Sequence, residues 1–243
     1  MRIKIILPIT QGFFDERQLD VAEHYAAAGT EITCTHLQKG PETIESQLDN
    51  AFAVPGIVEE ITEAVAEGYD GVFISCIGDP GLKAAREAAD IPVVGAAETS
   101  LIFASALAQR FSVITVLPSL VPLIEDHAKL LGVRERLASV RTIDVSVAEI
   151  NAARESGQAG ESLYGESIKA IEDDGAHALI LGGTCMAGVG PDLEKKLAQR
   201  SGYRIPVIDS GIAPVKFLEA LVSLGLTQSK LTYAAPAEKK RTV

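Results

Sequence analysis

The sequence lacks long apolar runs and an even number of cysteines. No stretch reaches the roughly 18 consecutive apolar residues that a membrane-spanning helix needs. The opening run, Met1–Pro8, carries charge among its apolar residues and has no small-residue cleavage pattern, so we expect a first strand there and not a secretory signal. The three cysteines, Cys34, Cys76 and Cys185, cannot all pair, which predicts free thiols in a reducing cytoplasm.

Several motifs that carry chemistry are also absent. No Gly-x-Gly-x-x-Gly follows an expected strand and no Gly-x-x-x-x-Gly-Lys-Ser/Thr loop occurs, so a nucleotide site has no support. The Gly-x-Ser-x-Gly elbow of α/β-hydrolases is missing. The four histidines do not have the spacing of a zinc site: His24, His36, His127 and His177. We therefore expect neither a bound nucleotide nor a metal ion.

Basic residues are the minority among the charges. The chain has 22 Lys and Arg against 33 Asp and Glu, a formal net charge of −11. An acidic surface repels phosphate backbones and anionic lipids, which argues against nucleic acid and membrane surfaces as partners. With 47% apolar residues, a chain of 243 residues can bury one large core or two smaller ones.

Short apolar, β-rich runs alternate with amphipathic helical patterns along the chain. This alternation predicts an α/β fold with parallel sheets covered by helices on both faces. The expected strands are Ile3–Leu7, Glu31–His36, Gly71–Ser75, Ile91–Val94, Ser112–Leu117, Thr142–Val147, Ala178–Leu181 and Ile205–Ile208. The expected helices are Pro55–Glu67, Leu82–Ala89, Leu101–Ala108, Leu120–Leu131, Glu161–Asp173 and Leu193–Gln199, with a last helix around Pro214–Leu224.

The order of these runs repeats after roughly 110 residues, which indicates a duplicated unit. Thr115-Val116-Leu117-Pro118 echoes Ile5-Ile6-Leu7-Pro8, and Ile205-Pro206-Val207-Ile208 echoes Ile91-Pro92-Val93-Val94. We expect residues 1–97 and 211–231 to form a first domain, because the last helix should pack back on the first half. Residues 98–210 should form a second domain. Residues 232–243 should form a flexible tail, whose run Lys239-Lys240-Arg241 is interpreted as a solvated end.

Cys76 closes the strand pattern Val72–Ser75 and is followed by Ile77-Gly78-Asp79-Pro80-Gly81. Ligands of open parallel sheets bind beyond the carboxyl ends of the strands, which places Cys76 at a candidate site. Asp79 is predicted to be an N-cap and Pro80 the first helical residue. A nearby helix N-terminus favours a thiolate. An ordinary thiol is only about 3% ionised at pH 7, so this placement would provide a base for a carbon-bound proton.

Cys185 also follows an expected strand, in Leu181-Gly182-Gly183-Thr184-Cys185-Met186. If the two halves face each other, one thiolate can remove a proton from a stereocentre while the other thiol delivers a proton to the opposite face. Backbone N–H groups and four hydroxyls could stabilise the enolate oxygen that forms between these steps: Thr10, Thr99, Ser100 and Thr184. Cys34 alternates with Ile32 inside a strand and is interpreted as core packing.

The chain resembles the aspartate/glutamate/hydantoin racemase superfamily, and most closely its hydantoin racemase branch. The resemblance covers nearly the whole chain and rests on Gly40–Ser46, Cys76–Gly81 with Lys83–Glu87, Ile91–Gly95 and Leu181–Gly188. It implies two pseudo-symmetric flavodoxin-like (Rossmann-like) domains, an active site with a cysteine pair in the interdomain cleft, no cofactor and a homo-oligomer.

Two positions depart from the pattern of that superfamily. Its second motif usually reads Leu-Gly-Cys-x-Gly-Met, which puts cysteine where this chain has Gly183. A step of 107 positions from Cys76 also lands on Gly183, so Cys185 lies two residues late. Hydantoin-type members commonly carry Pro-Asn after the first strand, whereas Pro8 is followed here by Ile9.

The predicted site therefore has Cys76 and Cys185 as the catalytic pair. The predicted substrate-binding residues flank these cysteines or follow other strands: Pro8, Ile9, Thr10, Ile77, Gly78, Glu98, Thr99, Pro118, Gly183, Thr184 and Met186. The expected partner is a small molecule with a carbonyl-activated stereocentre.

Three functional hypotheses follow. The first is a cofactor-independent racemase of a 5-substituted hydantoin or related cyclic ureide such as allantoin, because an α-proton beside an imide carbonyl is comparatively acidic. Aspartate or glutamate racemisation ranks lower, since few cationic residues lie at the strand ends. The second is a single-thiol isomerase or decarboxylase of the same superfamily. The third is a ligand-binding protein without turnover, which the displaced cysteine favours.

Overall fold

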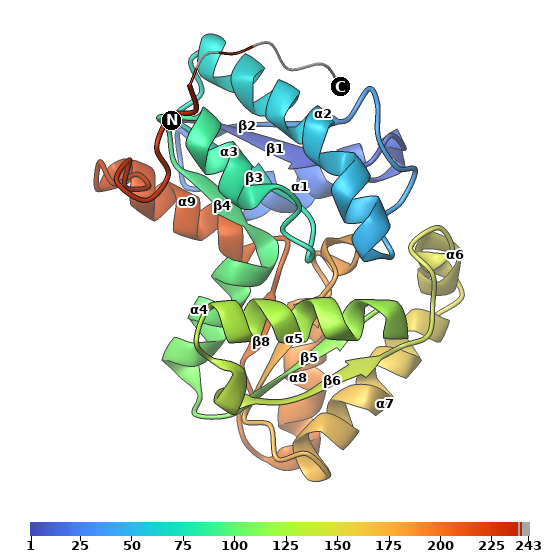
Figure 1. The fold of residues 1–243 in the computed structure, drawn as a ribbon. Coiled ribbons are helices and arrows are strands. Elements are labelled where there is room, and N and C mark those ends of the chain that lie inside the picture. The colour runs from blue at the N-terminus through green and yellow to red at the C-terminus, as the bar shows by residue number, and fades with distance from the viewer. Residues whose placement is uncertain (238, 240–243) are drawn as a thin grey trace. The chain divides into compact units, whose positions relative to one another are not determined.

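The computed structural model describes residues 1–237 and 239, and its contacts divide the chain into two compact units. The first unit contains Met1–Gly95 and the chain from Pro214 onward, and the second contains Ala96–Ala213. Each unit is an α/β layer structure around its own parallel sheet (Figure 1). Within the described residues, no helix is both long enough and apolar enough to cross a bilayer.

The first unit is built on a parallel sheet with the strand order β2-β1-β3-β4. Its strands are β1 (Arg2–Leu7), β2 (Glu31–His36), β3 (Gly71–Ile74) and β4 (Val93–Gly95). Ile3, Ile5 and Ile6 have no exposed surface, as expected for a strand that is covered on both faces. In Figure 1, α2 (Gln47–Ala66) and α3 (Leu82–Ala88) lie in front of this sheet, and α1 (Asp15–Tyr25) lies behind it.

The helix near the C-terminus, α9 (Ala213–Ser223), is held to the first unit by a buried carboxylate. Oε1 of Glu219 accepts hydrogen bonds from the Ala27 N–H and the Thr30 hydroxyl, both at 2.7 Å. Burial disfavours the charged form of Glu219, but hydrogen bonds from Lys216, Thr30 and Ala27 outweigh this effect and lower its pKa. Glu219 therefore ties α9 to the turn between α1 and β2.

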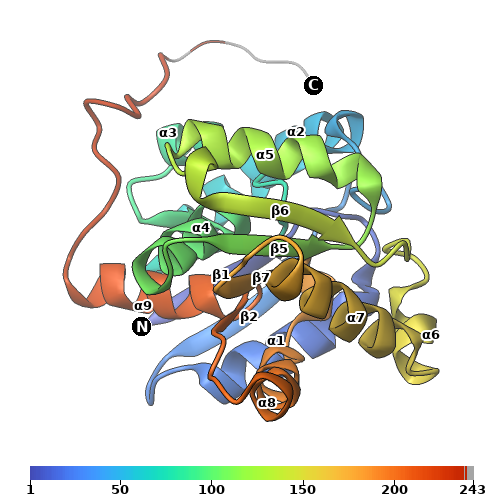
Figure 2. The same ribbon diagram turned by 90° about the horizontal axis from the view of Figure 1, so that it is seen from below.

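The second unit repeats the topology of the first, with the strand order β6-β5-β7-β8. Its strands are β5 (Phe111–Thr115), β6 (Leu137–Thr142), β7 (Ala178–Gly182) and β8 (Val207–Asp209). Figure 2 shows α5 (Val121–Leu130) on one side of β5 and β6, with α7 (Gln158–Glu172) on the other. Helices α4 (Ala96–Leu107), α6 (Ile150–Glu155) and α8 (Gly190–Ser201) complete the unit. The predicted α/β class with two duplicated parallel sheets is confirmed.

The prediction for the strand at Thr142–Val147 was wrong, because β6 ends where that strand was expected to begin. Beyond Thr142 the chain still follows β5, since the Ile143 N–H donates to the Thr115 carbonyl at 3.0 Å. However, Asp144 has a φ of 53°, a left-handed conformation that interrupts a regular strand. The apolar alternation of Ile143 and Val145 therefore reflects two buried side chains in an irregular segment.

Helix α2 begins at Gln47, eight residues before the predicted start at Pro55. Ser46 is its N-cap, and the Ser46 hydroxyl accepts the Asp49 N–H at 3.2 Å. Pro55 lies inside the helix, where it cannot donate to the carbonyl four residues earlier. Two helices, α1 and α6, had no counterpart in the sequence prediction.

Part of the predicted tail contacts the first unit. Arg86 on α3 donates a hydrogen bond of 3.3 Å to the Tyr233 hydroxyl, and the Cζ of its guanidinium lies 5.4 Å from the centroid of the Tyr233 ring, within the range of a cation–π contact. Most of the run Lys239-Lys240-Arg241 lies outside the described residues, as do 238, 242 and 243.

An ion-pair cluster joins β6 to α7 and the turn that follows α7. Arg141 donates to both carboxylate oxygens of Asp174, at 2.6 and 2.9 Å, and to Glu166 at 3.2 Å. The Arg141 guanidinium lowers the pKa of Asp174 below its ordinary value of 3.8, since these hydrogen bonds outweigh partial burial.

Replacing Asp174 by asparagine should reduce the free energy of unfolding at pH 7 by about 1 kcal/mol. A carboxylate with a lowered folded pKa contributes stability above its unfolded pKa and loses that contribution as the pH falls through the folded value. The difference between wild type and Asp174→Asn in urea unfolding should therefore shrink from about pH 5 to about pH 3. Asp173→Asn is the control, because that side chain is 66% exposed and 3.8 Å from Arg141. A difference that stays constant at low pH would contradict this account.

Candidate active site

The loop after β3 places Cys76 at the carboxyl edge of the first sheet. The Cys76 N–H donates to the Ile74 carbonyl at 3.0 Å, and the Asp79 N–H donates to the Cys76 carbonyl at 3.0 Å. This tight turn directs the Gly78 N–H at the Cys76 sulfur, at 3.4 Å. Cys76 is half-buried, so its thiol is neither sealed in the core nor fully solvated. A backbone N–H that donates to the sulfur stabilises negative charge on it.

The prediction of Asp79 as an N-cap and Pro80 as the first helical residue was wrong. Helix α3 begins at Leu82, the start of the predicted run Leu82–Ala89, and its N-cap residue is Gly81, at a φ of 65° and without a side-chain cap. Asp79 has a φ of 42° and is buried. Its carboxyl group packs against β4, where a Cβ on Gly95 would lie 2.4 Å from the Asp79 Cγ. The N–H that reaches the sulfur therefore comes from the turn itself and not from a helix terminus.

The loops after β1 and β2 are hydrogen-bonded to each other at the same edge of the first sheet. The Leu37 N–H donates to the Ile9 carbonyl at 2.8 Å, and the Thr10 N–H donates to the Pro41 carbonyl at 2.9 Å. The Thr10 hydroxyl also donates to the Pro41 carbonyl, at 3.4 Å. Pro8 and Ile9 are buried, whereas Thr10 is half-buried. Ile77 and Gly78, from the cysteine loop, are buried as well.

The second unit carries Cys185 in the loop after β7. The Thr115 hydroxyl on β5 donates to the Gly182 carbonyl at 2.6 Å, which fixes the start of this loop. A single turn of 3-10 helix follows over Thr184–Met186. Arg154 on α6 donates to the Cys185 carbonyl at 3.3 Å. Thr184 and Cys185 are half-buried, and Met186 is buried.

The turn brings the Cys185 sulfur back beside position 183. A Cβ built on Gly183 would lie 3.2 Å from the Cys185 Sγ, 3.4 Å from the Met186 Cε and 3.7 Å from the Val116 Cγ1. Gly183 has an extended backbone, with φ −174° and ψ 121°, which any residue can adopt. The thiol of residue 185 therefore lies next to the space that a side chain at residue 183 would enter.

A buried carboxyl group connects the cysteine loop of the second unit to the end of β8. Asp209 accepts hydrogen bonds from the Gly188 N–H at 2.8 Å and the Gly211 N–H at 2.9 Å. Burial raises the pKa of Asp209, although these backbone donors partly oppose the shift. Sequence reasoning missed this residue. The available signal was a charged residue directly after the predicted strand Ile205–Ile208. Arg154 was also missed, because it lies on α6, a helix that no sequence pattern predicted.

The remaining predicted residues differ in how far they are buried. Glu98 is half-buried on α4, and Thr99 is 1% exposed, with no hydrogen-bond partner for its hydroxyl within the described residues. Pro118, which follows β5, is exposed. Cys34 is half-buried in β2, where it pairs in register with Ile5. No group of three or more His, Cys, Asp or Glu side chains in the described part of the chain could hold a metal ion.

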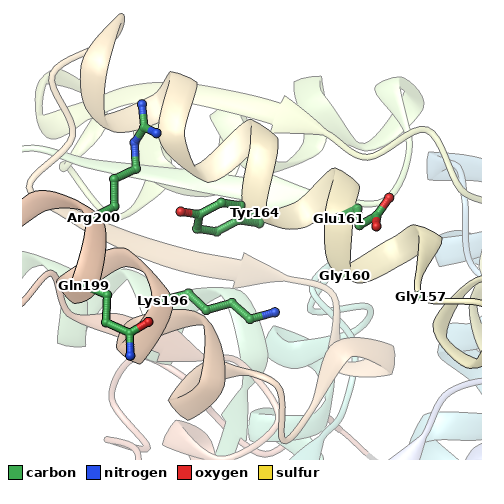
Figure 3. A pocket seen from close by; sticks show the side chains of 7 residues that line it. All are labelled: Gly157, Gly160, Glu161, Tyr164, Lys196, Gln199 and Arg200. Atoms are coloured by element: carbon green, nitrogen blue, oxygen red, sulfur yellow. The ribbon is translucent and has the colours of Figure 1, made fainter.

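Two grooves on helix surfaces of the described residues contain no cysteine. One, of about 780 Å³, lies between α7 and α8. Figure 3 shows Glu161 and Tyr164 projecting from α7, with Lys196 and Gln199 on the neighbouring helix α8. The other groove, of about 480 Å³, is lined by α2 residues such as Phe52 and by the loop that contains Pro41.

These observations define a class: a duplicated flavodoxin-like α/β protein with a half-buried cysteine in a loop at the carboxyl edge of each sheet. The family model for Asp/Glu/Hydantoin racemase matches residues 13–218. The chain belongs to this family, and its full-length similarity to hydantoin racemases indicates an isomerase of the racemase type.

Three similar proteins illustrate the relationship. The hydantoin racemase of Pseudomonas sp. (strain NS671) is 41% identical over 99% of this chain and 94% of its own length. The hydantoin racemase of Rhizobium meliloti is 37% identical, over 98% of this chain and 96% of its own length. The structure of allantoin racemase from Klebsiella pneumoniae is 36% identical and has a TM-score of 0.93, covering 100% of this chain and 96% of that one.

Replacing Gly182 by alanine should destabilise the second unit. The new Cβ would lie 2.5 Å from the Val113 Cγ1 and 3.0 Å from the Ile114 carbonyl oxygen, and a central strand cannot yield to such contacts. We expect the free energy of unfolding in urea to fall by about 1–3 kcal/mol. Gly160→Ala is the control, since a Cβ there meets nothing within 4 Å on α7, and it should be neutral or stabilising. Equal stability of the two variants would contradict the packing described for β7.

Proposed function

We propose that this protein is a cofactor-independent racemase that inverts the stereocentre of a 5-substituted hydantoin or a related cyclic ureide such as allantoin. The proposal is supported by family membership together with similarity over the whole chain to proteins named hydantoin racemase and allantoin racemase. The observation that carries the chemistry is the position of a half-buried thiol in the corresponding loop of each duplicated unit.

In the proposed reaction, Cys76 and Cys185 act as the acid/base pair. One cysteine thiolate takes the α-proton, and the electrons of the broken C–H bond move onto the adjacent carbonyl to give an enolate. The other cysteine, as a thiol, returns a proton to the opposite face of the carbon, which inverts the centre. The reverse reaction uses the same two groups with exchanged roles, so no net oxidation, reduction or co-reactant is needed.

The Cys185 geometry supports the assignment of this residue as the second thiol. Its sulfur lies 3.2 Å from where a Cβ on Gly183 would be, which supports the proposal that the 3-10 turn compensates for the two-residue shift in sequence. Polar groups near the loops, including Thr10, Thr99 and Thr184, are proposed to bind the substrate. Pro8, Ile9, Ile77, Gly78, Glu98, Pro118, Gly183 and Met186 are proposed to shape the remainder of the site.

The first test measures racemisation and deuterium incorporation together, from single enantiomers of hydantoins and of allantoin in D₂O. With two acid/base groups, the product enantiomer should carry deuterium from the first turnover, while unconverted substrate keeps protium. Cys76→Ser and Cys185→Ser should each reduce racemisation by about 10²–10⁴-fold. Cys34→Ser, on the half-buried strand cysteine, is the matched control and should retain activity.

Full racemisation by Cys185→Ser would exclude the two-thiol mechanism. If that variant keeps turnover with a single stereochemical outcome, a single-thiol isomerase or decarboxylase becomes the correct description. A ligand-induced rise in melting temperature without deuterium exchange in the wild-type protein would instead identify a binding protein.

The second test exchanges the two positions, as Gly183→Cys combined with Cys185→Gly. The new side chain at residue 183 fits the existing extended backbone, and the sulfur that would crowd it at 3.2 Å is removed. We expect racemisation within about tenfold of wild type, against a loss of about 10²–10⁴-fold for Cys185→Gly alone. Failure of the exchange to recover activity over Cys185→Gly would show that the sulfur must come from residue 185.

A further inference from the structure

Asn50 lies on α2 and faces the loop that carries Cys76, although no motif pointed to it. Its side chain is 8% exposed, and its Nδ2 donates to the Gly78 carbonyl at 3.4 Å. The two residues are in close contact, since a Cβ on Gly78 would lie 2.5 Å from the Asn50 Oδ1 and 2.8 Å from its Nδ2. The amide of Asn50 therefore packs directly on the Cα of Gly78, and only glycine fits there without a shift.

Gly78 is the residue whose N–H donates to the Cys76 sulfur at 3.4 Å. A backbone N–H can hold this direction only if the rest of the glycine is fixed, because glycine has a wide choice of backbone conformations. The Asn50 amide restricts Gly78 through two contacts. It donates to the Gly78 carbonyl, and it packs against the Gly78 Cα. The contacts thus form a chain from α2 through Gly78 to the sulfur.

The Asn50 Oδ1 has no hydrogen-bond partner within the described residues, although it is buried. Natural cores rarely leave a buried acceptor unpaired, because its desolvation is not repaid. An apolar side chain of similar size would avoid this cost, so stability alone does not account for an amide at this position. The feature that an apolar residue could not provide is the hydrogen bond to the Gly78 carbonyl.

Charged groups also lie on the elements around the Cys76 loop. Asp79, in the same loop, is a buried carboxyl group. The Asp49 carboxylate on α2 accepts a hydrogen bond from the Ser46 hydroxyl, and the Arg86 Nε on α3 donates a hydrogen bond to the Val93 carbonyl. Lys4 on β1 pairs with Glu60 of α2 at 2.8 Å, and His36 ends β2 on the far side of β1.

We propose that Asn50 is a positioning residue for Cys76: its buried amide holds Gly78 so that the Gly78 N–H stays directed at the sulfur and favours the thiolate. Asn50 acts through Gly78 and does not itself exchange a proton. The role in turnover rests on the proposed function of Cys76 as an acid/base group, whereas the effect on the thiol itself does not.

The test measures the rate of iodoacetamide alkylation of Cys76 between about pH 5 and pH 10, quantified on the Cys76 peptide by mass spectrometry. Asn50→Ala and the near-isosteric Asn50→Leu should move the midpoint of the Cys76 profile upward by about one pH unit, which is a roughly tenfold loss of thiolate below the midpoint. The Cys185 peptide in the same samples is the internal control and should keep its profile. Leu48→Ala, on an exposed α2 residue, is the matched control variant.

Unchanged Cys76 midpoints in both folded Asn50 variants would overturn the proposal, as would an equal shift in Leu48→Ala. Circular dichroism and the urea midpoint establish that the variants are folded, and Asn50→Leu fills the space that Asn50→Ala leaves empty. If racemisation is detected, kcat should fall about tenfold with little change in KM. If no tested compound is racemised, the alkylation profile still decides the role of Asn50, so the two proposals fail separately.

Discussion

The arrangement of this molecule depends on one constraint: the strands of a parallel sheet all end at the same edge, so the loops that follow them meet there. In the first unit, this constraint brings the loop after β1 against the loop after β2, through the hydrogen bonds of Ile9 and Thr10. It places Cys76 at the end of the neighbouring strand β3. In the second unit, the same edge joins the Cys185 loop to β8 through Asp209.

Each unit has a buried carboxyl group between its cysteine loop and its last strand, but the two units supply it from different segments. In the first unit, the carboxyl group of Asp79 comes from the cysteine loop and lies on Gly95 at the end of β4. In the second unit, the carboxyl group of Asp209 comes from the end of β8 and accepts the Gly188 N–H of the cysteine loop. Each unit therefore has one buried carboxyl group between the cysteine loop and the last strand. The two units therefore share the location of a buried carboxyl group but not the residue that supplies it.

Most of the fold could be predicted from the sequence, because buried parallel strands are continuous apolar runs and the repeat doubles the evidence for each of them. The failures have physical causes. Helix α1 is too polar to show an apolar face, although Gln18 and Ala22 are buried. Asp144 adopts a left-handed backbone in a segment whose apolar alternation is typical of a strand. Asp79-Pro80 has the composition of a helix start but forms a turn, because the Asp79 carboxyl group packs on Gly95 instead of capping α3.

The site was less predictable than the fold, since its cysteines follow strands but the residues that hold their loops come from elsewhere in the chain. Asn50 and Arg154 contact the two loops across 28 and 31 positions of sequence. The return of the 3-10 turn at Cys185 has a wider consequence. A short turn can present the sulfur of residue 185 beside a side-chain position two residues earlier, because the turn reverses the direction of the chain. The place of a thiol in space is therefore not fixed by its place in the sequence alone, and the proposed role of Cys185 depends on this difference.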